Sequence, residues 1–156
     1  MRRFKQQLPD DEARRILTRA THGVLSLVDV DGGPYGVPMS FVYDGAQTIY
    51  FHGAREGRKT DCVRHAGRAS FCVVAMDEIH PEEFTTYYRS VVAEGRIGVV
   101  TEREQTIGAL RMLGAKYSPG LDSTHETESN LDRVSVFRFE IETVSGKEAI
   151  ELTRRR

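Results

Sequence analysis

The dipeptide Asp44-Gly45 stands between two apolar runs and constrains the fold of this chain more than any other feature. The run Gly36–Tyr43 precedes it and Gln47–His52 follows it, and both contain residue types that are common in β-strands. Asp-Gly between two such runs indicates a β-hairpin, so we predict an antiparallel pair here. Pro38 lies within the first run. Since proline cannot donate a ladder hydrogen bond, it is expected at a sheet edge, a strand start or a bulge.

Other runs of β-type residues follow the same pattern, with turn residues between them. Gly95 and Gly98 lie inside the longest run, where glycine indicates a bend such as the one that curls a sheet into a barrel. The polar segment Leu121–Asn130 is predicted to be a loop, and Ser145-Gly146 a turn. The remaining predicted strands are Gly23–Val30, Ala69–Met76, Tyr87–Val100, Val134–Val144 and a last short one within Lys147–Leu152.

Helical periodicity is limited to a few segments. Asp10 is a suitable N-cap for a helix that ends before Gly23, and a second helix is predicted to begin near Gly57. Thr101 and Glu104 have the spacing of a capping box for a third helix. About six or seven strands with about three helices, joined mostly as hairpins, indicate a mainly β fold of the α+β class. We predict a small antiparallel β-barrel with flanking helices, and one domain over residues 1–156.

Charge and composition exclude several classes of function. Hydrophobic residues make up 39% and charged residues 29% of the chain, which is typical of a soluble globular protein. A formal net charge of −1 argues against a general nucleic-acid or membrane-surface binder. Cys62 and Cys72 are expected to be buried thiols, and the first residues lack the apolar stretch of a signal peptide. We therefore expect a cytoplasmic protein.

The stretch FHGAREGRKTDC places Arg55, Arg58 and Lys59 at or just before a predicted helix start. The N-terminus of a helix carries partial positive charge, so cations there are mildly unfavourable unless they bind an anion. Free backbone N–H groups and mobile cations together form a site for a phosphate group. The alternative is a surface helix whose basic residues are partly neutralised by Glu56 and Asp61.

The ordered set of motifs resembles the FMN-binding split-barrel proteins, the pyridoxamine 5′-phosphate oxidase-like family. The resemblance is carried by GVPMSFVYDG, IYFHGAREGRKTDCVRHAGRASFCVV and YRSVVAEGRI. It is strongest to the branch that contains the nitroimidazole-resistance reductases. The resemblance implies a split antiparallel β-barrel. The basic residues with which a vitamin B6 oxidase grips its second phosphate are not recognisable, so that activity is not expected.

The resemblance also implies roles for particular residues. The backbone of the first hairpin strand would lie along the flavin ring, and the FHGA segment would line the ring and the ribityl chain. Two cations would hold the FMN phosphate, and two residues of the long strand would come from the partner subunit or the pocket wall. In that order, these residues are Val37, Pro38, Met39, Ser40 and Phe41; Phe51, His52, Gly53 and Ala54; Arg58 and Lys59; and Ser90 and Val91.

His52 is the candidate catalytic residue, because its imidazole titrates near neutrality and can move protons during reduction of a substrate. The alternative is a histidine that only packs at a strand end. The other histidines lack metal-ligand spacing, so no metal site is expected. Tyr87, Tyr88 and Tyr117 either stack on a ring or fill the core and an interface.

These features lead to the hypothesis of an FMN-dependent oxidoreductase. It would take electrons from NAD(P)H and reduce a small oxidised substrate such as a nitro compound or a quinone. The family implies a homodimer with FMN at the subunit interface. The alternatives are a protein that binds the deazaflavin F420 or haem, and a non-catalytic flavin carrier or sensor.

Overall fold

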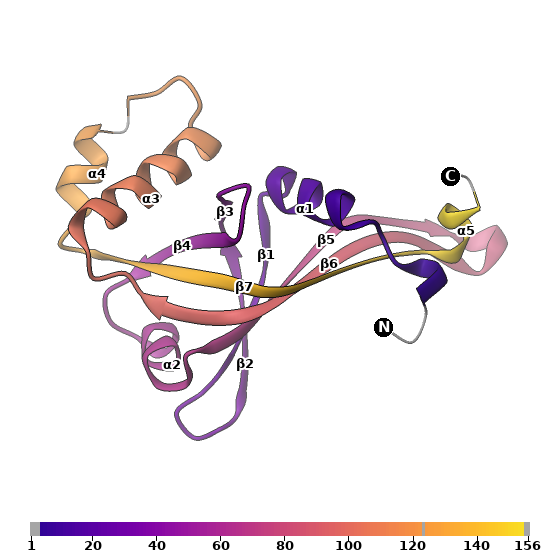
Figure 1. Cartoon of the computed structure of the whole chain (residues 1–156), viewed down its shortest axis with the longest axis horizontal. Helices are drawn as coiled ribbons and strands as arrows, with labels where there is room; N and C mark the ends of the chain where they lie inside the picture. The colour runs from indigo at the N-terminus through magenta and orange to yellow at the C-terminus, as the bar shows by residue number, and fades with distance from the viewer. Residues whose placement is uncertain (1–3, 123, 155–156) are drawn as a thin grey trace.

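A computed structural model describes residues 4–122 and 124–154 of the chain (Figure 1). Its centre is one antiparallel sheet with the strand order β2-β1-β5-β6-β7-β4-β3. The strands are β1 (His22–Val28), β2 (Pro34–Ser40), β3 (Val42–Tyr43), β4 (Thr48–Ala54), β5 (Arg68–His80), β6 (Thr85–Val99) and β7 (Val134–Glu148). The helices are η1 (Phe4–Gln6), α1 (Asp10–Arg19), α2 (Arg58–Ala66), η2 (Pro81–Glu83), α3 (Arg103–Tyr117), α4 (Thr124–Asn130) and α5 (Ile150–Thr153). The predicted mainly β split barrel with flanking helices is confirmed.

The two edges of the sheet are β2 and β3, and Phe41 alone separates these strands in the chain. The sheet therefore curls until its edges meet at this residue. Pro38 lies on β2, an edge strand, as one of the alternatives for a strand proline requires. The predicted hairpin is present in part. Val42 and Tyr43 pair with β4 across the Asp44-Gly45 turn, whereas residues 36–40 of the predicted first strand belong to β2 and pair with β1. Asp44 accepts the backbone N–H groups of residues 46, 47 and 48 through Oδ1.

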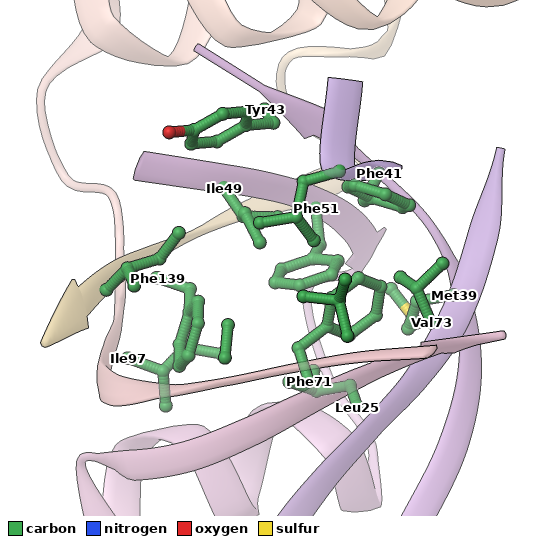
Figure 2. Close-up of a cluster of buried hydrophobic side chains, with 14 of the residues drawn as sticks. Leu25, Met39, Phe41, Tyr43, Ile49, Phe51, Phe71, Val73, Ile97 and Phe139 are labelled. Carbon is green, nitrogen blue, oxygen red and sulfur yellow. The ribbon is translucent and has the colours of Figure 1, made fainter. Parts of the chain in front are cut away.

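Alternation along the strands places one side-chain set inside the barrel. In β1 the residues alternate strictly between exposed and buried, as a half-buried strand should. Phe41, Phe51 and Phe71 are fully buried at the centre (Figure 2), with ring centroids 4.7 Å apart for Phe41–Phe71 and 5.0 Å apart for Phe51–Phe71. Edge-to-face contacts of this kind add to the stabilisation from burial alone.

Gly95 marks a bulge between β6 and β7. The pairing register shifts between Glu94 and Gly95. A Cβ atom at position 95 would lie 1.9 Å from the carbonyl oxygen of Glu140, so only glycine fits this close approach of two backbones. The bend that the sequence predicted at Gly95 is confirmed.

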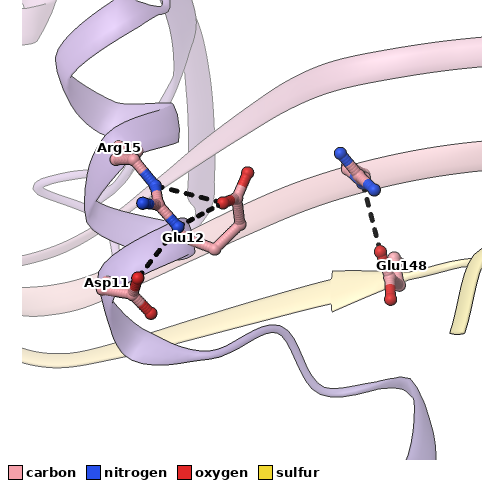
Figure 3. A network of polar contacts seen from close by, with 5 residues as sticks. Asp11, Glu12, Arg15 and Glu148 are labelled. Carbon is pink, nitrogen blue, oxygen red and sulfur yellow. Dashed lines mark hydrogen bonds and ion pairs between the residues drawn. The ribbon is translucent and has the colours of Figure 1, made fainter. Parts of the chain in front are cut away.

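Helix α1 covers one side of the barrel, and its exposed face carries Arg15 hydrogen-bonded to Asp11 and Glu12 (Figure 3). The helix begins at Asp10 with Pro9 at the N-cap, so the prediction of Asp10 as the N-cap was wrong. Figure 3 also shows Glu148 near the end of β7, where its buried carboxylate pairs with Arg89 at 3.1 Å. This pair lies on the long arm of β5, β6 and β7 that extends away from the barrel toward α5 (Figure 1).

Several boundaries differ from the prediction. Residues 124–130 form α4 instead of a loop, and α3 begins at Arg103 with Glu102 at the N-cap, so the capping box of Thr101 and Glu104 does not form. β7 continues through Ser145-Gly146 as one strand, and the segment after Glu148 is the short helix α5. None of the described helices is both long and apolar enough to span a membrane.

Candidate functional site

A cavity of about 930 Å³ lies between β4 and the helical pair α3 and α4. Ser40 at the end of β2 and His52 on β4 contribute its polar side chains from the barrel. Leu110, Leu113 and Tyr117 face it from α3. The remaining wall residues are Gly114, Ser118, Leu121, Asp122, Thr127 and Val134. An open pocket of this size, with a mostly apolar wall and few polar groups, has the character of a small-molecule site.

Strand alternation explains why His52 faces this cavity. Ile49 and Phe51 on β4 are fully buried in the barrel core, and His52 between Phe51 and Gly53 faces outward. Desolvation of the ring lowers the pKa of His52 below its ordinary value of 6.5, and the positive charge of Lys59 lowers this pKa further. His52 is therefore a neutral imidazole at neutral pH, with one nitrogen free to accept a proton and the other able to donate one.

The end of the barrel near Gly53 holds the ammonium group of Lys59. Lys59 Nζ lies 3.3 Å from the sulfur of Met39 and 5.8 Å from the ring centroid of Phe137. A Cβ atom at position 53 would lie 2.7 Å from this Nζ, so glycine in the FHGA segment leaves room for the lysine. Burial lowers the pKa of Lys59. No carboxylate of a described residue pairs with Lys59, so this cation is available to an anion.

Arg58 is placed differently. Its Nε donates to Oδ2 of Asp29 at 2.6 Å, and its guanidinium lies 4.2 Å from the ring centroid of Tyr35. Asp29 also accepts the Val30 amide, and that bond together with Arg58 holds the pKa of this carboxyl below its ordinary value. The sequence analysis did not identify Asp29, because it lies 29 residues before Arg58 and no local pattern links them.

Tyr117 joins α3 to the barrel at the edge of the cavity. Its hydroxyl accepts the Phe41 N–H at 2.8 Å and contacts the carbonyl oxygens of Phe41, at 2.9 Å, and of Thr21. The preceding Lys116 donates to the Ala20 carbonyl, and its Nζ lies 4.1 Å above the Phe41 ring. Of the two alternatives for Tyr117, the structure therefore shows the packing role. The backbone N–H of Phe41, expected to face a flavin ring, already has a partner.

The predicted first-strand residues divide between the two faces of β2. Val37 and Met39 point into the barrel, whereas Pro38 and Ser40 point out. Phe41 and Phe51 are fully buried, so a ligand could meet these two residues only through their backbone. Ala54 follows Gly53 at the exposed end of β4. The structure thus brings Ser40 and His52 together at the cavity and places Met39, Gly53 and Lys59 at the adjacent end of the barrel.

Ser90 and Val91 lie far from this group within one chain. Phe51 pairs with Phe137 of β7, whereas Ser90 pairs with Lys147 of the same strand. This separation corresponds to roughly 30 Å along an extended strand. The side chain of Val91 is fully buried in the core cluster that also contains Phe51. A wall formed by Ser90 and Val91 in the same chain's cavity is therefore excluded, which leaves the partner subunit as the only expected way for them to reach a cofactor.

One group of possible metal ligands lies apart from the cavity. Among the described residues, His80, Glu82 and Glu83 place ligand atoms within 4.8 Å of one another at the tip of the β5–β6 arm. His80 stacks on Tyr87 with ring centroids 3.9 Å apart, and Tyr87 donates to Glu83. The spacing of the histidines gave no sign of this group, because its other members are glutamates.

Comparisons with known proteins find solved structures with a similar fold. A similar solved structure, with a TM-score of 0.79 and 20% identity, is a candidate 5-nitroimidazole antibiotic resistance protein from Bacteroides thetaiotaomicron; the match covers 91% of this chain and 86% of that one. An FAD and heme binding protein from Mycobacterium smegmatis has a TM-score of 0.76 and 22% identity, with 93% and 73% covered. An FAD-binding protein from Mesorhizobium loti has a TM-score of 0.65 and 26% identity, with 92% and 97% covered.

Among curated proteins, none matches this chain. The family model described as pyridoxamine 5′-phosphate oxidase matches residues 9–148, a segment that includes every strand of the barrel and both walls of the His52 cavity. The chain therefore belongs to the pyridoxamine 5′-phosphate oxidase family.

Proposed function

We propose that this protein is a flavin-dependent oxidoreductase that takes electrons from NAD(P)H and reduces a small oxidised substrate, such as a nitro compound or a quinone. The observation that carries the proposal is the cavity of about 930 Å³ that His52 faces. It lies beside a barrel end that holds Lys59, which has no carboxylate partner among the described residues. Solved relatives of this fold include proteins that bind FAD. Their ligands support a flavin here, and FMN is the form that we propose.

The residues present fit a flavin phosphate at one point in particular. The described contacts of the Lys59 ammonium are a thioether and an aromatic ring, which neutralise no charge. A partly buried cation of this kind is stabilised by a bound anion. Arg58 offers its two terminal nitrogens at the start of α2, because its described hydrogen bond to Asp29 uses only Nε. Lys59 and Arg58 would therefore hold the phosphate.

The flavin supplies the hydride and electron chemistry, and this chain supplies position and protons. The apolar face of α3 forms one wall of the cavity that His52 faces. His52 is neutral at neutral pH, so its imidazole can donate one ring N–H to an oxygen atom of a bound substrate. The same ring can take up a proton from solvent at its other nitrogen, which makes it the proposed proton carrier of the site.

We propose a homodimer, supported by a row of small or apolar residues across the outer face of the sheet. Pro38 pairs with Val24, Val24 with Cys72, and Cys72 with Val92, so the row crosses four neighbouring strands. Val24 is 42% exposed in the single chain. Light scattering coupled to size exclusion should give a dimer for the wild type and a monomer for Val24→Asp; a monomeric wild type would refute this part.

The first test is the visible absorption spectrum of the purified protein. We expect the two bands of an oxidised flavin, or their appearance on titration with FMN, and bleaching on anaerobic addition of NADPH. Titrations with FAD, F420 and haem under the same conditions separate the cofactor alternatives, since tighter binding of F420 or haem than of any flavin would overturn the proposal. Bound flavin that neither NADH nor NADPH reduces would instead indicate a carrier or a sensor.

The phosphate contact is tested by Lys59→Met. We expect this variant to bind FMN at least about tenfold more weakly, because a charge-assisted hydrogen bond contributes roughly 1.5–3 kcal/mol. Riboflavin lacks the phosphate and serves as the internal control, so its affinity should not change. An equal loss for FMN and riboflavin would mean that Lys59 acts on the ring site or on the fold.

A further inference from the structure

A second cavity, of about 370 Å³, lies next to the His52 cavity, and Val134 is in the wall of both. We call it the arginine pocket, because Arg55, Arg64 and Arg103 all line it. These arginines come from three places in the chain: the segment after β4, the last turn of α2 and the first turn of α3. The rest of the wall is formed by the ends of β6 and β7 and the segments next to them.

Within the described part of the chain, no carboxylate forms an ion pair with the three arginines of the pocket. Arg64 and Arg103 form no hydrogen bond or ion pair with any described residue. Arg55 donates to the backbone carbonyl of Asp132 at 3.0 Å, which is a neutral acceptor. Asp132 is the single acidic residue of the wall, so positive charge is in excess. Outside the pocket, six arginines pair with carboxylates, whereas no ion pair is described for five others. The paired arginines are Arg15, Arg58, Arg68, Arg89, Arg96 and Arg138, and the others are Arg14, Arg19, Arg111, Arg133 and Arg154.

Backbone and hydroxyl groups add to the preference for an anion. The first turn of α3 lies in the wall, and its N-cap residue, Glu102, makes no side-chain cap. The first amide groups of this 15-residue helix therefore have no cap from the Glu102 side chain, and the helix dipole favours negative charge at this end. The hydroxyl-bearing residues Thr101 and Ser135 are in the same wall.

We propose that the arginine pocket binds the diphosphate group of a nicotinamide dinucleotide, whose nicotinamide end extends past Val134 into the His52 cavity. Guanidinium groups bind phosphate oxygens in a bidentate manner, and three of them from separate elements suit a group with several charged oxygens better than a single carboxylate. Arg58 and Lys59, at the other end of α2, hold the first phosphate of the flavin in the proposed function. The arginine pocket is a separate site, so the diphosphate that suits it is that of the nicotinamide donor, which shares no phosphate with the flavin.

Inorganic pyrophosphate is the probe for the pocket itself, and its binding to the full chain is measured by calorimetry at low ionic strength. We expect the double variant Arg64→Gln/Arg103→Gln to bind pyrophosphate at least about tenfold more weakly than the wild type. Arg68→Gln is the matched control, because Arg68 lies four residues after Arg64 and already pairs with Glu142 at 2.8 Å. The control should stay within about twofold. Failure of the wild type to bind pyrophosphate, or an equal affinity in the double variant, would overturn the proposal.

Two further measurements show which molecule supplies the diphosphate, and only these two rest on the proposed function. Weaker binding of FAD with unchanged binding of FMN in the double variant would instead place the second phosphate of a flavin dinucleotide in the pocket and overturn the assignment to the donor. A raised KM for NADPH with unchanged flavin binding would assign it to the donor. If both stay unchanged while pyrophosphate binding is lost, the link to the His52 cavity is wrong. A wild type that binds pyrophosphate and no flavin would refute the proposed function alone.

Discussion

Removal of one hydroxyl group, in Tyr117→Phe, tests how α3 is fixed to the barrel. The hydroxyl accepts the N–H of Phe41 at 2.8 Å, and Phe41 is fully buried. Phenylalanine keeps the ring and its packing, so the substitution deletes only the hydrogen bonds. A buried donor left without a partner costs about 1–3 kcal/mol, and we expect the free energy of unfolding to fall by that amount.

The measurement is urea denaturation followed by circular dichroism, with an unchanged slope showing that the two states have kept their compactness. For a chain of 156 residues, each 1 kcal/mol corresponds to a shift in Tm of roughly 2–4 °C. Tyr50→Phe is the control, since the Tyr50 hydroxyl has no hydrogen bond to a described residue. A loss below about 0.5 kcal/mol in Tyr117→Phe, or a loss equal to that of the control, would refute the view that this hydroxyl fixes α3.

The remaining predictions concern the strand bulge and the two titrating groups. Gly95→Ala should cost at least about 3 kcal/mol of folding stability or prevent folding, because its Cβ atom would collide with the Glu140 backbone; Gly98→Ala, with no atom within 4 Å of the new Cβ, should cost less than about 1 kcal/mol. An NMR titration of His52 should give a midpoint below 6.5, and Lys59→Met should raise it without reaching 6.5, since desolvation is the larger cause. The pKa of His52 is lower in the folded state than in the unfolded state, so its contribution to folding stability is present above pH 6.5 and is lost as the pH falls below that value. On acidification below pH 6.5, the wild type should therefore lose stability faster than His52→Gln.

Local patterns were sufficient for most of the strands, and alternation accounts for the side of β4 that carries His52. The run Gly36–Tyr43 is divided between β2 and β3, and the predicted last strand is replaced by the end of β7 and α5. Alternation around Phe51 requires that its neighbour point away from the core, and the Asp44-Gly45 turn fixes the pairing of β3 with β4. The barrel class followed from the number of hairpins and from the bend at Gly95. These features depend on interactions between residues that are close in sequence or directly paired across strands.

Long-range packing explains most of the errors. Gly146 was read as a turn residue, yet a Cβ atom there would lie 2.7 Å from Cβ of Leu8, so this glycine serves the contact of β7 with the N-terminal segment. The sequence of helix α4 has no apolar stripe to indicate it. Among its described side chains, Thr127 is buried and lines the His52 cavity. In the site, the pairing of Arg58 with Asp29 depends on the fold bringing together two segments that no spacing rule connects.

The single residue between the two edge strands limits how the barrel can respond to a ligand. Consecutive Cα atoms are about 3.8 Å apart, so the ends of β2 and β3 on either side of Phe41 can separate by no more than about 7 Å. Phe41 therefore links the two edges of the sheet covalently, next to Ser40 in the wall of the His52 cavity. A large ligand must therefore be accommodated by movement of α3 and α4. The distance between β2 and β3 stays the same whether or not the cavity is occupied.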